Sequence, residues 1–121
     1  MKIIRFEDLD VWKEATSLAV DIYGISMDGK LSKDFGLLDQ IRKSAVSIAS
    51  NIAEGKERET VPEFIRFLYI AKGSAGELRT QIYIAQQIGY LEREKYEELK
   101  ARAEKISGML GNLIKALKKG K

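Results

Sequence analysis

The chain has 121 residues, a net charge of +3 and a hydrophobic content of 45%, which fits one soluble globular domain covering residues 1–121. It has no cysteine and no histidine, which excludes disulfides, thiol nucleophiles, thiolate metal sites and the commonest general base. No apolar run reaches the roughly 18–20 residues of a membrane span. With an N-terminus that lacks the pattern of a signal peptide, we expect a cytoplasmic protein with no membrane partner.

Hydrophobic spacing of three and four residues predicts four helices, over about residues 8–27, 35–54, 61–88 and 92–118. Asp8 is expected to cap the first helix, and Ser32 or Asp34 the second. Gly55 is placed for a left-handed cap at the end of the second helix. The third helix has three start signals, since Thr60 is a cap, Pro62 follows in the first turn, and Glu63 completes a capping box.

No segment alternates as a strand does, so the expected class is all-α. Short connections between the helices predict an antiparallel, up-down-up-down four-helix bundle. Gly73 and Gly76 interrupt the third helix, and each costs about 1 kcal/mol relative to alanine. We therefore expect these two glycines to permit close approach of a neighbouring helix.

The second helix carries a polar stripe beside its apolar one. This stripe could be a binding site, or it could form hydrogen bonds inside the bundle or between subunits, and we favour the structural role. We expect Arg42 or Arg66 to pair with Glu54 or Glu77. The expected network consists of Gln40, Arg42, Ser44, Ser47, Asn51, Glu54, Arg58, Arg66 and Glu77.

Three helices carry more apolar residues than one bundle interior can bury. Apolar patches of this extent usually mark interfaces, and closed homo-oligomers are the ordinary result. We therefore predict a homo-oligomer. The candidate interface residues are Trp12, Ala19, Tyr23, Val46, Ala49, Ala53, Tyr69, Ile70, Tyr83 and Ile84.

Basic residues accumulate toward the end of the chain, where no acid follows Glu104. They could form a surface that binds RNA or DNA, or they could serve only solubility and the dipole of the last helix. No base-reading motif is present, so binding would be sequence-tolerant and weakened by salt. The candidate residues are Lys100, Arg102, Lys105, Lys115, Lys118, Lys119 and Lys121.

No nucleophile–base pair, metal-ligand set or phosphate-binding glycine loop can be identified. Glu94, Glu97 and Glu98 are clustered, but Arg93, Lys95 and Lys100 alternate with them, as on an exposed charged face. We therefore expect no catalytic residue, no cofactor and no metal, and a protein that is not an enzyme.

Several motifs together resemble the "four helix bundle protein" family, also called the S23 or 23S ribosomal-RNA intervening-sequence protein family. The resemblance covers nearly the whole chain. Ala49 departs from the family pattern, because relatives often carry proline there. The matching segments are Phe6-x-x-Leu9-x-Val11-Trp12, Phe35-Gly-Leu37, Gln40-Ile-Arg42, Ser47-Ile-x-x-Asn51-Ile-Ala-Glu-Gly55, Arg58, and Phe64-x-x-Phe67-Leu-x-Ile-Ala71-x-Gly73-Ser74-x-x-Glu77-Leu78.

The resemblance implies a four-helix bundle that assembles as a homopentamer. Genes for some members lie within intervening sequences of bacterial large-subunit ribosomal RNA. Other members resemble the accessory variability determinant of diversity-generating retroelements, which binds nucleic acid and a reverse transcriptase. We therefore expect a non-enzymatic oligomeric bundle that binds nucleic acid, or an enzyme acting on it, through its basic surface. The alternative is a structural or protein-interaction scaffold without a nucleic-acid role.

Overall fold

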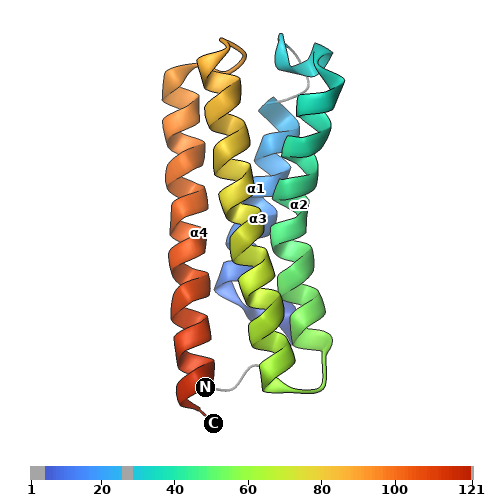
Figure 1. Cartoon of the computed structure of the whole chain (residues 1–121), viewed down its shortest axis with the longest axis vertical. Helices are drawn as coiled ribbons and strands as arrows, with labels where there is room; N and C mark the ends of the chain where they lie inside the picture. Colours follow the sequence, from blue (N-terminus) through green and yellow to red (C-terminus); the bar gives the residue numbers. More distant parts are fainter. Residues whose placement is uncertain (1–4, 26–28, 121) are drawn as a thin grey trace.

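A computed structural model describes residues 5–25 and 29–120, and these ranges contain four long helices, two short 3-10 helices and no strand (Figure 1). The predicted all-α class with four helices is confirmed. The predicted end of the first helix, at residue 27, lies outside the described residues. The elements are η1 (Phe6–Asp8), α1 (Asp10–Ile25), η2 (Leu31–Lys33), α2 (Phe35–Glu57), α3 (Val61–Gln87) and α4 (Arg93–Lys119).

Of the three helix caps predicted from the sequence, those of α2 and α3 are confirmed and that of α1 is wrong. Asp34 Oδ1 accepts a hydrogen bond from the Leu37 amide at 3.1 Å. Thr60 Oγ1 likewise accepts from the Glu63 amide at 3.3 Å. Each side chain satisfies an amide that has no partner within its helix. Asp8 does not cap α1 as predicted, because it ends η1, and α1 begins at Asp10.

The long axes of the four helices run side by side, and each helix packs against two others (Figure 1). The large side chains that are almost completely buried come from all four helices, so the described residues share one core. They occupy the predicted three-and-four spacing. These residues are Leu18, Ile22, Ile41, Ile48, Ile52, Leu68, Leu78, Ile82, Leu99, Ile106 and Leu110.

Gly55 lies inside α2 and does not cap it, so the predicted helix end at Glu54 is wrong. A Cβ atom built on Gly55 would lie 2.6 Å from Cβ of Phe67 and 3.3 Å from the carbonyl oxygen of Phe64. Real Cβ atoms do not approach that closely. Gly55 therefore allows α2 to continue to Glu57 while the first two turns of α3 pack directly against its backbone.

Gly73 and Gly76 do not mediate a close approach within the chain. A Cβ atom built on either residue would meet no other atom within 4 Å, and Gly73 is exposed. The predicted close approach of a neighbouring helix is therefore not made by any helix in the described part of this chain, and for a helix of another copy it stays a prediction. Their positions are on the side of α3 that faces away from the core.

No helix in the described ranges is long and apolar enough to cross a membrane.

Candidate nucleic-acid interface

The candidate basic residues do not form one continuous patch. Arg102 donates to Asp21 Oδ2 of α1 at 2.6 Å and to Ser17 Oγ at 3.2 Å. Lys105 is 3.5 Å from the Glu14 carboxylate, also on α1. These two cations are therefore paired with acids across the α1–α4 contact, and their charges are largely balanced.

Three of the other candidate lysines, Lys115, Lys118 and Lys119, lie in the last turns of α4. Lys115 and Lys119 are exposed and have no ion-pair partner among the residues described here. Lys118 Nζ donates to the Tyr69 hydroxyl at 3.0 Å and lies 5.4 Å from the centre of the Tyr69 ring. Lys100 is half-buried two turns into α4, and Lys121 lies outside the described residues.

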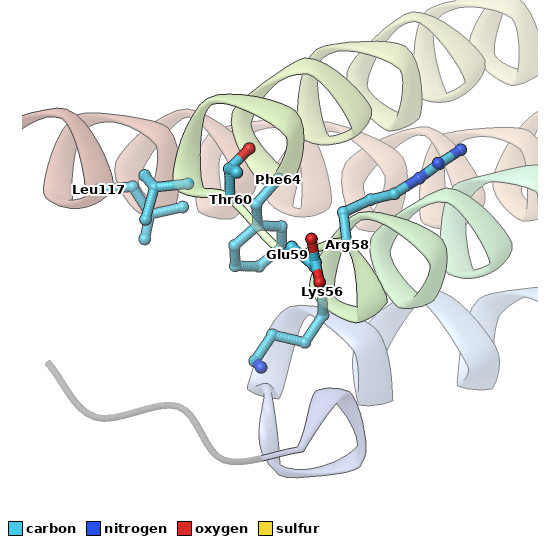
Figure 2. Close-up of a pocket in the computed structure, with 7 residues that line it drawn as sticks. Lys56, Arg58, Glu59, Thr60, Phe64 and Leu117 are labelled. Carbon is cyan, nitrogen blue, oxygen red and sulfur yellow. The ribbon is translucent and has the colours of Figure 1, made fainter.

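A small pocket of about 230 Å³ lies beside the last turns of α4, and two further cations, Lys56 and Arg58, line it. It lies between the turn that joins α2 to α3 and the last turns of α4. In Figure 2, Phe64 lies between Leu117 and that turn, and the side chains of Lys56 and Arg58 extend in different directions. Glu59 also lines the pocket. Arg58 is partly neutralised, because it donates to Glu54 at 3.0 Å.

The polar stripe of α2 forms a hydrogen-bonded group with α3. The hydroxyl oxygens of Ser47 and Ser74 are 2.9 Å apart. Asn51 Nδ2 donates to both the carbonyl oxygen and the hydroxyl of Ser47, each at 2.9 Å. Ser44 is buried beside this group, whereas Gln40 is exposed. The sequence had not identified Ser74, a buried polar residue of α3, as the partner.

The predicted pairing of Arg42 or Arg66 with Glu54 or Glu77 is wrong for the part of the chain that the structure describes. Arg66 pairs with Glu63 at 3.3 Å, and Glu54 pairs with Arg58. Both pairs join residues three or four positions apart along the chain, a spacing that brings side chains within reach at a helix surface. The Arg42 guanidinium lies over the Tyr23 ring at 4.5 Å, while Glu77 is exposed on α3.

Five of the predicted interface residues line one apolar groove between α1 and α2, with a volume of about 410 Å³. The side chains of Phe6, Thr16, Val20 and Ser50 complete it. The rings of Phe6 and Trp12, which both line it, have centres 5.4 Å apart. The predicted residues in the groove are Trp12, Ala19, Val46, Ala49 and Ala53.

The other predicted interface residues lie elsewhere. Tyr23 is on α1 beneath Arg42, as described above. Four residues are exposed to between 39% and 50% on α3, namely Tyr69, Ile70, Tyr83 and Ile84. The predicted set is thus divided between two surfaces, one formed by α1 and α2 and the other by α3.

Phe35 is an exposed aromatic residue that the sequence analysis did not select as a site. It is 78% exposed at the first position of α2. Lys30, Lys33, Asp34 and Tyr90 line a hollow of about 490 Å³ beside it. The sequence could have indicated its exposure, because Phe35 directly follows the cap Asp34 and does not belong to the buried stripe of α2.

Within residues 5–25 and 29–120, no cluster of three or more acidic side chains is arranged as a metal site.

Comparisons with known proteins agree with the family resemblance. The model of the 23S rRNA-intervening sequence protein family matches residues 7–112. A similar solved structure is that of a protein of unknown function from the S23 ribosomal protein family of Bacteroides thetaiotaomicron VPI-5482, determined at 1.70 Å resolution. It is 29% identical, with a TM-score of 0.79, over 87% of this chain and 98% of the other. A search of curated proteins found no match. Because the family model spans most of the sequence, the chain belongs to the 23S rRNA-intervening sequence protein family.

Proposed function

We propose that this protein is a non-enzymatic, oligomeric helical bundle that binds nucleic acid through the C-terminal end of α4. The observation that carries this proposal is the pair of exposed lysines, Lys115 and Lys119, which have no acidic partner in the described ranges. Lys118 and Lys56 lie at the same end. Unpaired cations on a surface attract phosphates, and binding them releases counterions from the nucleic acid.

The chemistry of this surface favours phosphate contacts over base readout. Lysine is a point charge on a flexible stem, so it can contact a phosphate without defining which base lies beside it. We therefore propose a sequence-tolerant interaction with RNA or DNA that salt weakens strongly. A reverse transcriptase or another protein that itself acts on nucleic acid is a further candidate partner, on the basis of the family resemblance alone.

We also propose that the working form is a homo-oligomer of up-down-up-down bundles, with a pentamer as the expected size. Two observations support self-association. The α1–α2 groove is apolar, and several large side chains of α3 are exposed on another surface. Two different patches on one chain produce head-to-tail contacts, which close into a ring when the rotation permits. A ring would repeat the lysines of α4 around its axis and sum their fields.

A scaffold without a nucleic-acid role is the second candidate, and the same groove favours it. The groove is lined by small and apolar side chains such as Ala49 and Ala53, which suit the packing of another helix. If the groove and the α3 surface are the only functional surfaces, the lysines serve solubility alone.

The two candidates are separated by a retention assay with structured RNA and duplex DNA at about 50 mM salt. The variant Lys115→Glu/Lys118→Glu/Lys119→Glu is compared with the wild type, with light scattering to show that both have the same mass. We expect the wild type to retain nucleic acid and the variant to lose it. Retention that survives the charge reversal would contradict the proposed surface.

A further inference from the structure

The end of the bundle opposite Lys115 and Lys119 combines an exposed aromatic ring with unpaired cations. The start of α2 and the turn between α3 and α4 lie together at the upper end in Figure 1, while the end of α4 lies at the lower end. Phe35 comes from the first segment and Tyr90 from the second, and both line one hollow. The Phe35 ring is 78% exposed, so its face is accessible to a ligand.

Hollows lie along Phe35 in two directions. One, of about 490 Å³, is shared with Lys30, Lys33, Asp34 and Tyr90. The other, also about 490 Å³, is shared with Gly36, Leu38, Asp39 and Arg42. Both volumes fall within the roughly 300–1,000 Å³ of small-ligand pockets. Gly36 has no side chain that could cover the ring.

The charges around Phe35 favour an anionic ligand. Neither Lys30 nor Lys33 has an ion-pair partner in the described part of the chain. Among the described residues, two acids line these hollows, and each already has a hydrogen-bond or ion-pair partner. Asp34 accepts from the Leu37 amide, and Asp39 pairs with Lys43 at 3.0 Å. Asp34 keeps its negative charge in that bond, but two lysines against this one unpaired carboxylate leave a net positive charge beside the ring.

We propose that Phe35, Tyr90, Lys30 and Lys33 bind an unpaired nucleotide of a single-stranded nucleic acid. The base stacks on the Phe35 ring, and the flanking phosphates contact the two lysines. Aromatic rings beside a basic groove are the usual means by which proteins bind single strands without reading sequence. A second copy of the chain could cover the ring instead, but an apolar contact between copies would gain nothing from two unpaired lysines beside it.

This inference rests on the proposed function, because it gives the same nucleic acid a second point of contact. Lysines at one end hold the backbone of a structured region, and the aromatic end holds an adjoining unpaired nucleotide. The two contacts are on one chain, so a nucleic acid that reaches both gains affinity through effective concentration.

The test is fluorescence anisotropy with labelled single strands of about 12 nucleotides, oligo(U) RNA and oligo(dT) DNA, alongside duplex RNA. Phe35→Leu keeps an apolar side chain but removes the aromatic face, whereas Phe35→Trp keeps the face. We expect Phe35→Leu to weaken single-strand binding about 5- to 100-fold and Phe35→Trp to retain it. Duplex binding should be unaffected by either change. The RNA and DNA arms show whether the sugar matters.

The lysines are tested by the salt dependence of the same binding. Each lysine that contacts a phosphate contributes about 0.7 to the slope of log affinity against log salt for a single strand. We expect Lys30→Gln and Lys33→Gln each to reduce the slope by about that amount. The control is Lys13→Gln, which removes the same charge near the start of α1, whereas Lys30 and Lys33 follow the end of α1. It should leave the slope unchanged.

Four results would overturn the inference. The inference fails if Phe35→Leu binds single strands as well as the wild type does, or if the wild type binds only duplex RNA. Either result leaves the proposed function standing. A changed mass for Phe35→Leu in light scattering would identify the ring as a contact between copies. No binding of any oligonucleotide by the wild type at about 50 mM salt would remove the proposed function as well.

Discussion

Gly55 of α2 and Phe67 of α3 are packed so closely that a Cβ atom on Gly55 would lie 2.6 Å from Cβ of Phe67. Phe67 is itself buried and carries the guanidinium groups of Arg58 and Arg66 over its ring, at 4.8 Å and 4.7 Å. The ring therefore has little room to move away. The contact fixes how the first turns of α3 sit on the end of α2.

Gly55→Ala is expected to destabilise the protein by about 1–3 kcal/mol, the range for an overpacked site. Alanine is the better helix former, so the loss must come from the clash and not from propensity. The measurement is the midpoint of urea unfolding at fixed protein concentration. Gly108→Ala is the matched control, since nothing lies within 4 Å of its added Cβ atom. It should stabilise by up to about 1 kcal/mol, and equal behaviour of the two variants would contradict the packing argument.

The hydrogen bond between Ser47 and Ser74 is expected to contribute to stability across the α2–α3 contact. Ser47→Ala and Ser74→Ala should each cost about 0.5–1.5 kcal/mol, because each removes the bond between the two hydroxyls, and Ser47→Ala also removes the bond that Asn51 donates to Ser47 Oγ. In a double-mutant cycle the double variant should lose less than both single losses together. Thr80→Ala, on an exposed side chain, should change stability by less than about 0.5 kcal/mol. Strict additivity would show that the two serines are not energetically coupled.

Two pairs of basic residues can distinguish an effect of overall net charge on RNA binding from an effect of one specific surface. Lys115→Gln/Lys119→Gln removes two unpaired cations, whereas Arg102→Gln/Lys105→Gln removes two that are paired with α1. The first variant should weaken binding of structured RNA and lower its salt slope by up to about 0.9 for each contact. The second should change it little and cost at most about 1 kcal/mol of stability for each exposed pair. Equal losses of affinity in a retention assay would mean that only overall charge matters.

The α1–α2 groove is expected to hold a neighbouring copy of the chain. Val46 lines the groove, and Val46→Glu would place a charge where an apolar contact must form, so the mass in light scattering should fall toward that of a single chain. Val61 has the same exposed fraction, 40%, but lies at the start of α3, where an acid suits the helix dipole. Val61→Glu should therefore keep the wild-type mass. An unchanged mass for Val46→Glu would exclude the groove from the interface.

The four helices and their core could be predicted from the sequence because each depends on periodicity along one segment. Ile41, Ile48 and Ile52 recur on one face of α2, and their burial follows whichever helix covers them. The caps Asp34 and Thr60 act within three residues, so local spacing was sufficient.

Features that depend on contacts between helices were mispredicted or missed. Gly55 follows a long helical pattern, as a cap does, and only the position of Phe67 shows that it is a packing site. Arg66 could have reached several acids, and the nearest one along its own helix was the partner. Phe35 was missed because Tyr90, which lines the same hollow, comes from a segment far away in the sequence.

The most direct test of the account is the affinity of the wild-type chain for structured RNA at about 50 mM and about 200 mM salt. We predict binding at the lower concentration and a fall of at least tenfold at the higher, since the lysines of α4 would contact phosphates. No binding at about 50 mM salt, or an affinity that salt does not change, would contradict the proposed nucleic-acid interface.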